Sequence, residues 1–174
     1  LVENAIRAAG TAPSGAHQQP WTFVVISDPE TKRRLREGAE AEEREFYERR
    51  ATPEWKEAIR PIGTDWVKTH ITDAPYVIVV FEQPWRWENG VKVKHYYVRE
   101  SVGIAVGFLL AAFQEAGLCA LTHTPSPMRF LGEIDQIEID GKGGGGGARC
   151  LDGKRRNHLG QPCRRRRLAG EPRQ

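Results

Sequence analysis

The chain has 174 residues, enough for one domain with a hydrophobic core and too few for two. Its net charge of +3 is uneven: residues 141–174 hold ten Lys or Arg and two acids, which leaves 16 basic and 21 acidic residues in residues 1–140. The globular part is therefore mildly acidic. No signal peptide is visible, and the longest apolar run, residues 102–113, is too short to span a bilayer, so we expect a soluble chain without membrane contact.

Cysteine usage indicates the cellular compartment, and the first residue bears on where the chain starts. Cys119 is the one cysteine of the globular part, so the sequence predicts no disulfide framework there, and we expect a reducing, cytoplasmic setting. The sequence begins at Leu1, without Met and already inside an apparent helix. This start indicates that the true beginning is missing.

The first half of the chain predicts two helices around a strand. Residues 1–9 carry an apolar stripe typical of a helix, and residues 21–26 (WTFVVI) are β-branched and aromatic enough for a strand. Asp28-Pro29 then supplies an N-cap and a proline at the first helical position. This helix should reach about Arg50.

The middle of the chain predicts a helix and a buried strand. Thr52-Pro53 opens the helix, which should carry Trp55 and Lys68 and end near residues 72–75. Residues 76–81 (YVIVVF) form a continuous apolar run, which predicts a strand buried on both faces.

The last globular elements are a loop, a helix, a short strand and a short final helix. Residues 82–94 predict a loop with a tight turn at Asn89-Gly90. Residues 96–117 predict a helix that is apolar nearly all round, which favours burial in a core or, preferably in so small a protein, in a subunit interface. Residues 118–122 predict the strand, and residues 125–127 a turn into the final helix. Strands alternating with helices predict a three-layer α/β or an α+β domain.

Two places could carry chemistry. The polar loop between the first helix and the first strand holds Pro13, Ser14 and Gly15, and its backbone N–H groups could grip a ligand, unless it is an ordinary connection. Glu43 and Tyr47 lie four residues apart and so share a helix face, although such a charged run is also typical of a solvated surface.

Several segments of the chain, taken in order, form a recognisable set of motifs. The segments are AGTAPSGAHQQPW with TFVVISDPETKRRL, EEREFYERR, DWVKTHITDAPYVIVVF, KHYYVRESVGIAVGFLLAAFQEAGL and LTHTPSPM, and they cover roughly residues 3–134. In this order they resemble the nitroreductase superfamily of flavoproteins, in particular its iodotyrosine deiodinase branch. The resemblance implies an α+β fold (three-layer α/β/α), in which helices flank a mixed sheet and an intertwined homodimer binds FMN at each interface.

The resemblance assigns the cofactor-binding residues. Pro13, Ser14, Gly15 and Ala16 match the loop that touches the flavin ring, and the amide at Ala16 matches the donor to a substrate phenolate. Small residues suit this role because backbone N–H groups must approach a flat ring closely. Thr122 and Thr124 complete the cofactor set. Thr124 matches the catalytic hydroxyl that bonds to flavin N5, although it could instead cap the next turn.

The resemblance also assigns a substrate-binding trio. Glu43 matches the partner of a substrate ammonium, Lys68 the partner of a substrate carboxylate, and Tyr47 a further donor. No metal ligands are assigned. Because generic nitroreductases lack this trio, it favours a halotyrosine-like phenol over a nitroaromatic as substrate.

The leading hypothesis is an FMN-dependent oxidoreductase that reductively dehalogenates halotyrosine-like phenols, with electrons from NAD(P)H or a reductase. One alternative is an NAD(P)H-dependent nitroreductase or quinone reductase that acts on a nitroaromatic. The other is an inactive truncated fragment or non-catalytic binder. This last alternative arises because the family's arginine-rich phosphate-binding element, expected ahead of the first helix, is not in this chain, and the expected closing strand and second phosphate-binding arginine are not found in residues 135–174.

Residues 135–174 differ in character from residues 1–134. They hold half of all glycines in the chain and an RRRR run, with almost no apolar periodicity, so we expect an aberrant Gly/Arg-rich tail without order. We hypothesise that the tail results from translation of a GC-rich gene in the wrong reading frame. A basic arm that binds nucleic acid by charge is the disfavoured alternative, because no aromatic residues are interleaved.

Overall fold

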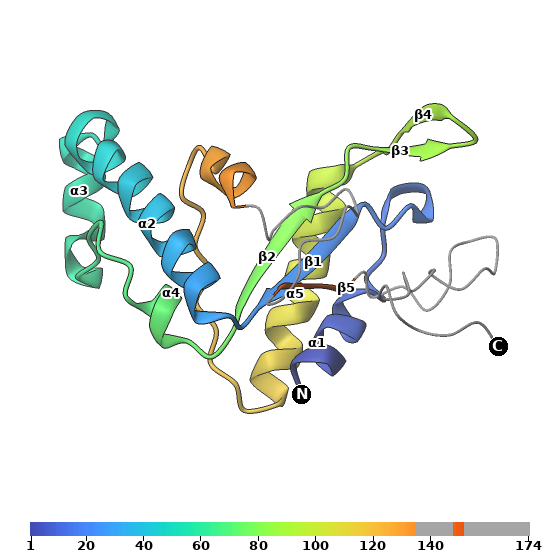
Figure 1. The fold of residues 1–174 in the computed structure, drawn as a ribbon, viewed down its shortest axis with the longest axis horizontal. Helices are drawn as coiled ribbons and strands as arrows, with labels where there is room; N and C mark the ends of the chain where they lie inside the picture. Colours follow the sequence, from blue (N-terminus) through green and yellow to red (C-terminus); the bar gives the residue numbers. More distant parts are fainter. Residues whose placement is uncertain (135–147, 152–174) are drawn as a thin grey trace. The chain divides into compact units, whose positions relative to one another are not determined.

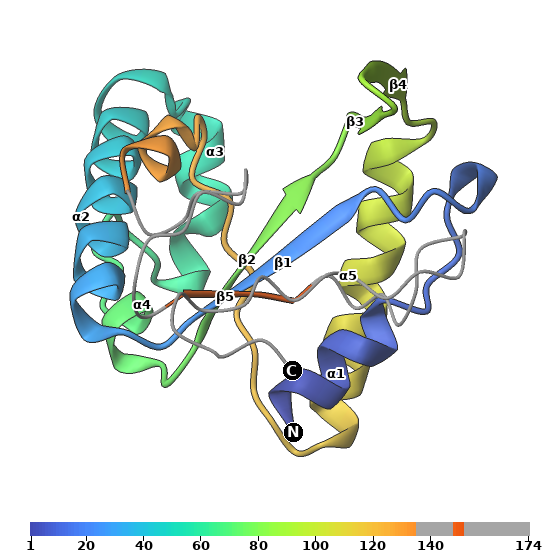
Figure 2. The same cartoon turned by 45° about the vertical axis from the view of Figure 1, so that its right-hand side comes forward.

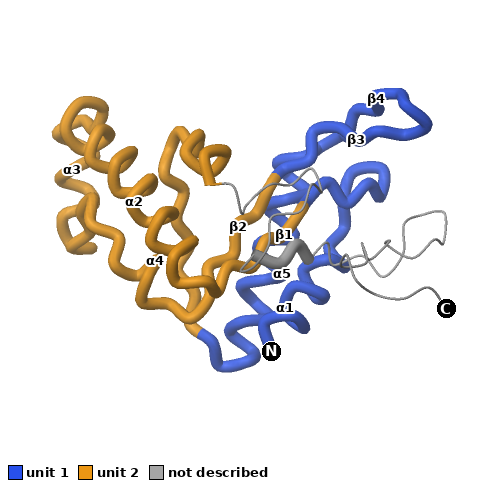
Figure 3. Tube along the Cα trace, in the orientation of Figure 1, with its two compact units in different colours: residues 1–21, 82–118, 152–174 blue, residues 22–81, 119–151 orange. Residues whose placement is uncertain are grey.

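A computed structural model of the chain describes residues 1–134 and 148–151, which form two compact units (Figure 3). The first unit comprises Leu1–Trp21 and Glu82–Leu118. The second unit comprises Thr22–Phe81 and the described part of Cys119–Leu151. Each unit is described separately below.

Two helices form the core of the first unit. Helix α1 (Val2–Ala9) and helix α5 (Val98–Glu115) lie side by side (Figure 1). From α1, Ile6 and Ala9 are buried, and α5 contributes buried residues at spacings of three and four: Val102, Ala105, Leu109 and Phe113. Burial of a side chain the size of Ile6 contributes about 1.5–3 kcal/mol, so this stripe accounts for the pairing of the two helices. Both predicted helices are confirmed.

The opposite face of α5 is apolar and open. Ile104 and Phe108 are 43% and 44% exposed, and a Cβ atom added at Gly103 or Gly107 would meet nothing within 4 Å. The prediction of a helix without a wide polar face is confirmed, whereas its burial in an interface stays a prediction. Among the described residues, no helix is long and apolar enough to cross a membrane.

A hairpin replaces the loop predicted for residues 82–94. Strand β3 (Trp85–Glu88) pairs antiparallel with strand β4 (Val91–Lys94). The tight turn at Asn89-Gly90 is confirmed, because both residues have positive φ angles, 51° and 79°, as this kind of hairpin turn requires. The prediction of a loop was wrong: WRWE and VKVK alternate and pair across the turn.

The main sheet has the order β2-β1-β5. Strand β1 (Trp21–Ile26) is antiparallel to β5 (Ala148–Leu151), and the N–H of Gln83 bonds to the carbonyl of Pro20, so β2 (Val77–Glu82) also runs antiparallel to β1 (Figure 2). The described strands thus form antiparallel sheets, where the resemblance implied a mixed one. Strand β2 is confirmed, but its side chains are half-buried, which contradicts burial on both faces.

The long helix of the second unit starts where the sequence predicts. Helix α2 (Pro29–Glu45) begins with the Asp28 carboxylate, which accepts a 2.7 Å hydrogen bond from the Thr31 N–H. Hydrogen bonds from the backbone and side chain of Thr31 lower the pKa of the Asp28 carboxyl. The helix continues as the π-helical turn Phe46–Arg50, so its predicted end is confirmed.

The second predicted helix is broken. Helix α3 (Pro53–Ile59) starts at the predicted cap Thr52 and passes through the 3-10 turn Arg60–Ile62, and α4 is the short helix His70–Asp73. A single helix to residues 72–75 was therefore wrong. Pro61 cannot donate a backbone hydrogen bond, and Gly63 takes the left-handed conformation (φ 68°) that ends helices.

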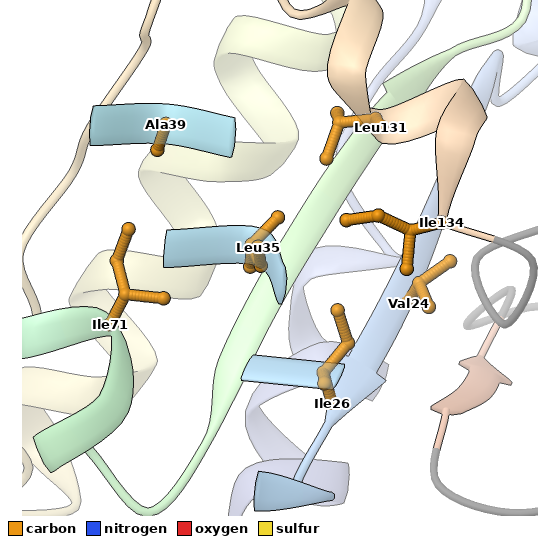
Figure 4. Packing of buried hydrophobic residues seen from close by; sticks show 7 residues of the cluster. All are labelled: Val24, Ile26, Leu35, Ala39, Ile71, Leu131 and Ile134. Carbon is orange, nitrogen blue, oxygen red and sulfur yellow. The ribbon is translucent and has the colours of Figure 1, made fainter. Parts of the chain in front are cut away.

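The core of the second unit lies between its helices and strands. Buried side chains from β1, α2, α4 and the 3-10 helix Arg129–Glu133 with Ile134 point toward one shared space (Figure 4). They are Val24, Ile26, Leu35, Ala39, Ile71, Leu131 and Ile134. A Cβ atom at Gly38 would lie 2.5 Å from the Phe130 ring, so glycine lets this ring lie directly on α2.

The segment after α5 has no regular structure until residue 129. A strand over residues 118–122 was therefore a wrong prediction, whereas the short final helix is confirmed as the 3-10 helix Arg129–Glu133. Of the tail predicted to lack order, the described part is strand β5, and the rest lies outside the described residues.

Candidate functional site

The loop that precedes β1 is tied to the start of α5. The Gly15 N–H donates to the Ser101 hydroxyl oxygen over 3.1 Å, and that hydroxyl donates to the Tyr97 carbonyl over 2.5 Å. The Ser14 hydroxyl oxygen accepts the Gln19 N–H at 2.8 Å. The loop is thus fixed at both ends by bonds that need small polar side chains.

Gly15 has no room for a side chain. A Cβ atom there would lie 2.8 Å from the Tyr96 carbonyl oxygen and 2.7 Å from a ring carbon of Tyr97. Because the first of these contacts is with backbone, it cannot be relieved by a rotamer change. From the sequence, glycine at this position is explained by the access it gives to a ligand. The structure adds a second explanation, because the chain before α5 approaches Gly15 closely.

Ala16 presents a backbone donor without a partner. The N–H groups of its neighbours Gly15, His17 and Gln18 all form hydrogen bonds, but that of Ala16 forms none among the described residues. Ala16 is exposed, and its φ of 49° is a left-handed conformation that alanine rarely adopts. A fixed, uncommitted N–H is suited to holding an anionic oxygen.

A cavity of about 300 Å³ adjoins this loop. It is lined by Ala16, His17, Gln18 and Arg86. The Gln18 side-chain oxygen accepts the Tyr96 N–H at 2.8 Å, and the Arg86 guanidinium, from β3, pairs with Glu88 at 2.9 Å. Sequence reasoning missed Arg86, because it placed this residue in a loop instead of a hairpin.

The second unit holds a buried ion pair. The Lys68 ammonium lies 3.3 Å from a carboxylate oxygen of Glu43, and the two side chains are only 6% and 14% exposed. The Lys68 ammonium also donates a hydrogen bond to the Asp65 carbonyl, and the Lys68 backbone N–H donates one to the Glu40 carboxylate at 2.8 Å. Two residues predicted from the resemblance, 25 positions apart, therefore meet directly.

Glu43 has a second partner that the sequence reasoning missed. His123 Nε2 lies 3.1 Å from the other carboxylate oxygen of Glu43. The His123 ring also packs edge-on against that of His70, with centroids 5.6 Å apart. Burial, and then the positive charges of His123 and Lys68, lower the pKa of His70. The available signal was the position of His123 between two threonines already assigned to the site.

Tyr47 joins the same cluster through its ring. The Lys68 ammonium lies 5.9 Å from the ring centroid, and the hydroxyl makes only a long contact, 3.4 Å, with the Thr64 carbonyl. Burial, and then the charge of Glu43, raise the pKa of Tyr47, so its hydroxyl stays a donor at neutral pH. The Trp55 ring packs edge-on against it at 5.5 Å.

Thr122 and Thr124 lie in the irregular segment after α5. Both are exposed, and neither side chain forms a hydrogen bond among the described residues. Thr124 therefore does not cap the next turn, which was the structural alternative for it. Of the predicted site residues, Glu43, Tyr47 and Lys68 are brought into contact, whereas the loop Pro13–Ala16 belongs to the first unit.

The chain belongs to the nitroreductase family, whose family model matches residues 1–126. A solved structure, oxidized iodotyrosine deiodinase bound to FMN and 3-iodo-L-tyrosine, matches the fold with a TM-score of 0.69 and 29% identity, over 86% of this chain and 72% of that one. The α+β, nitroreductase-like fold expected from the motifs is confirmed.

More specific similarity is to iodotyrosine deiodinases. The protein of that name from Haliscomenobacter hydrossis is 57% identical over 137 residues, which are 78% of this chain and 62% of the relative. That from Daphnia pulex is 50% identical over 126 residues, 72% of this chain and 42% of the relative. The chain thus spans less than two thirds of the length of these relatives.

Proposed function

We propose that this chain carries the site of an FMN-dependent oxidoreductase that removes halide reductively from halotyrosines. The observation that carries the proposal is the buried pair of Glu43 and Lys68, two opposite charges 3.3 Å apart. An amino acid zwitterion carries the complementary pair, an ammonium and a carboxylate. The similarity to iodotyrosine deiodinases supports the same substrate class.

The zwitterion can replace the internal pair with little electrostatic loss. Breaking a buried ion pair is costly when one charge is left alone, but here each charge would gain a new partner. Glu43 would accept from the substrate ammonium and Lys68 would donate to its carboxylate, with Tyr47 as a further donor. A phenol without the amino acid group offers no such exchange, so the cluster favours halotyrosine over a simple halophenol or a nitroaromatic.

The residues of the loop fit an FMN cofactor. Ser14 and Gly15 fix a backbone whose Ala16 N–H is uncommitted, and the Thr124 hydroxyl has no partner among the described residues. We propose that Pro13–Ala16, with Thr122 and Thr124, hold the flavin ring. When bound and reduced, FMN supplies two electrons which, with one proton, convert the carbon–halogen bond to carbon–hydrogen and release halide.

This chain's residues would then orient the reactants. The Ala16 N–H would hold the phenolate oxygen, and Thr124 would donate its hydroxyl to flavin N5. Glu43, Tyr47 and Lys68 would fix the amino acid end and exclude water around it. The division is between a backbone donor at the phenol and side-chain charges at the zwitterion.

The partners follow from the same proposal. We infer a homodimer because α5 leaves an apolar face with Ile104 and Phe108 more than two-fifths exposed, and its two glycines permit close approach. NAD(P)H or a reductase would return electrons to the flavin. The free, exposed thiol of Cys119 suits a reducing, cytoplasmic setting.

The proposal is tested with Glu43→Gln. This variant should weaken iodotyrosine binding to the FMN-loaded protein about tenfold or more, because a neutral amide loses the charge-assisted bond to an ammonium, and FMN binding should be unchanged. Equal loss of both ligands would contradict the role of Glu43. Turnover of nitroaromatics that is indifferent to Lys68→Ala would instead favour a nitroreductase, and failure to bind FMN would favour an inactive fragment.

A further inference from the structure

We propose that His123 is a positioning residue for the substrate ammonium group. It holds one carboxylate oxygen of Glu43 in place while the other oxygen exchanges Lys68 for the substrate. The inference rests on the proposed function, because it assigns a role within that substrate site. It concerns the second unit alone.

The direction of the hydrogen bond fixes the state of His123. A carboxylate only accepts hydrogen bonds, so the contact of 3.1 Å requires that Nε2 of His123 carry the proton. The same carboxylate faces Lys68 with its other oxygen, at 3.3 Å. Glu43 is thus held from two sides by two different elements, the segment before α4 and the segment after α5.

A ligand can displace one of the two partners of Glu43 but not the other. Lys68 is a single positive charge on a flexible stem, and it has a further acceptor in the Asp65 carbonyl. It can therefore turn toward a substrate carboxylate without losing every partner. The His123 imidazole is stiff and packs against His70, so it keeps its place.

Burial makes the lasting contact necessary. Glu43 is only 14% exposed, and a buried carboxylate with no partner is strongly destabilised. While Lys68 moves to the substrate, the His123 bond keeps Glu43 paired and aims its free oxygen at the incoming ammonium. His123 therefore matters for ligands that carry an ammonium and not for those that lack one.

This dependence gives the experiment. Wild type, His123→Leu and His123→Gln, each loaded with FMN, are titrated with iodotyrosine and with iodophenol, and the dissociation constants are measured from the flavin signal. We expect His123→Leu to weaken iodotyrosine binding roughly tenfold, the effect of one charge-assisted bond, and to leave iodophenol binding within about twofold. His123→Gln, whose amide can donate in place of Nε2, should restore most of the affinity.

A matched control and the contrary outcomes complete the test. Arg33→Met removes an exposed charge that pairs with Glu30, and it should change neither constant by more than about twofold. Equal weakening of both ligands in His123→Leu, or no change in either, would overturn the role of His123 while leaving the proposed function standing. A wild type that does not prefer iodotyrosine over iodophenol would overturn the proposed function, and this inference with it.

Discussion

The loop of the first unit and the charged cluster of the second unit, which we propose to serve one reaction, are built in opposite ways. In the loop Pro13–Ala16 the proposed binding group is the backbone N–H of Ala16, which is held by local backbone conformation and close packing: Ala16 has a φ of 49°, and Gly15 lies against the Tyr96 carbonyl. In the cluster of Glu43, Lys68 and His123 the proposed binding groups are side chains, held by an ion pair and a hydrogen bond to the Glu43 carboxylate. The first should fail when atoms are added and the second when charges are removed.

The difference also separates stability from binding. A loop held by close packing has one arrangement, so damage to it lowers the stability of the fold and ligand binding together. A cluster of paired charges can exchange partners, so damage to it should weaken iodotyrosine binding while FMN binding is retained. The following changes test that contrast, from the largest expected effect to the smallest.

Gly15→Val tests the loop. The new side chain would overlap the Tyr96 carbonyl oxygen, 2.8 Å from its Cβ, so the free energy of unfolding should fall by about 3 kcal/mol and FMN binding should be lost. Urea denaturation and flavin titration measure the two effects. Gly132→Ala is the control, because its Cβ would meet nothing within 4 Å. A Gly15→Val protein of normal stability would show that the loop is not close-packed.

Lys68→Met tests the cluster. It leaves the buried carboxylate of Glu43 with His123 as its remaining partner, so the free energy of unfolding should fall by about 2 kcal/mol, less than when such a charge is wholly unpaired. Iodotyrosine binding should fall at least tenfold, with FMN binding retained. Arg33, in an exposed ion pair with Glu30, supplies the control: Arg33→Met should change the stability by less than about 1 kcal/mol.

Acidification tests the charge balance around the cluster. The pKa of His70 lies below its usual 6.5, so below pH 6.5 the unfolded chain binds more protons than the folded one and stability falls as the pH falls. His70→Asn should flatten this part of the profile. Thermal unfolding of both proteins between pH 7.5 and 5.5 measures it, and parallel profiles would mean that His70 titrates normally.

Tyr47→Phe should have the smallest effect on the fold. Its hydroxyl makes one contact of 3.4 Å, too long to contribute much, so the free energy of unfolding should change by less than about 0.5 kcal/mol. Iodotyrosine binding should weaken several-fold through the lost donor. A large loss of stability would show that the hydroxyl supports the helix end and not the ligand.

Local signals predicted the elements that have them. Asp28-Pro29 and Thr52-Pro53 marked two helix starts to the residue, because capping chemistry is short-range. The hairpin Trp85–Lys94 was missed because its strands are only four residues long and stabilised by cross-strand pairs. The strand over residues 118–122 was expected from composition alone, and no partner strand faces it among the described residues.

The candidate site could likewise be predicted from the sequence only in part. The spacing of Glu43 and Tyr47 placed both on one helix face, and the structure confirms that they share a cluster with Lys68. Lys68 itself came from the family resemblance, since nothing local distinguishes it. His123 lies 80 residues from Glu43, and only the folded chain brings the two together.

The central claim is that the cluster around Glu43 and the loop around Ala16 serve one flavin-dependent reaction on a halotyrosine. The visible absorbance spectrum of the purified protein, recorded after FMN is added and while iodotyrosine is titrated in, tests it most directly. We expect a bound-flavin spectrum that iodotyrosine perturbs saturably. A flavin that binds but whose spectrum is unchanged at every iodotyrosine concentration would contradict the claim.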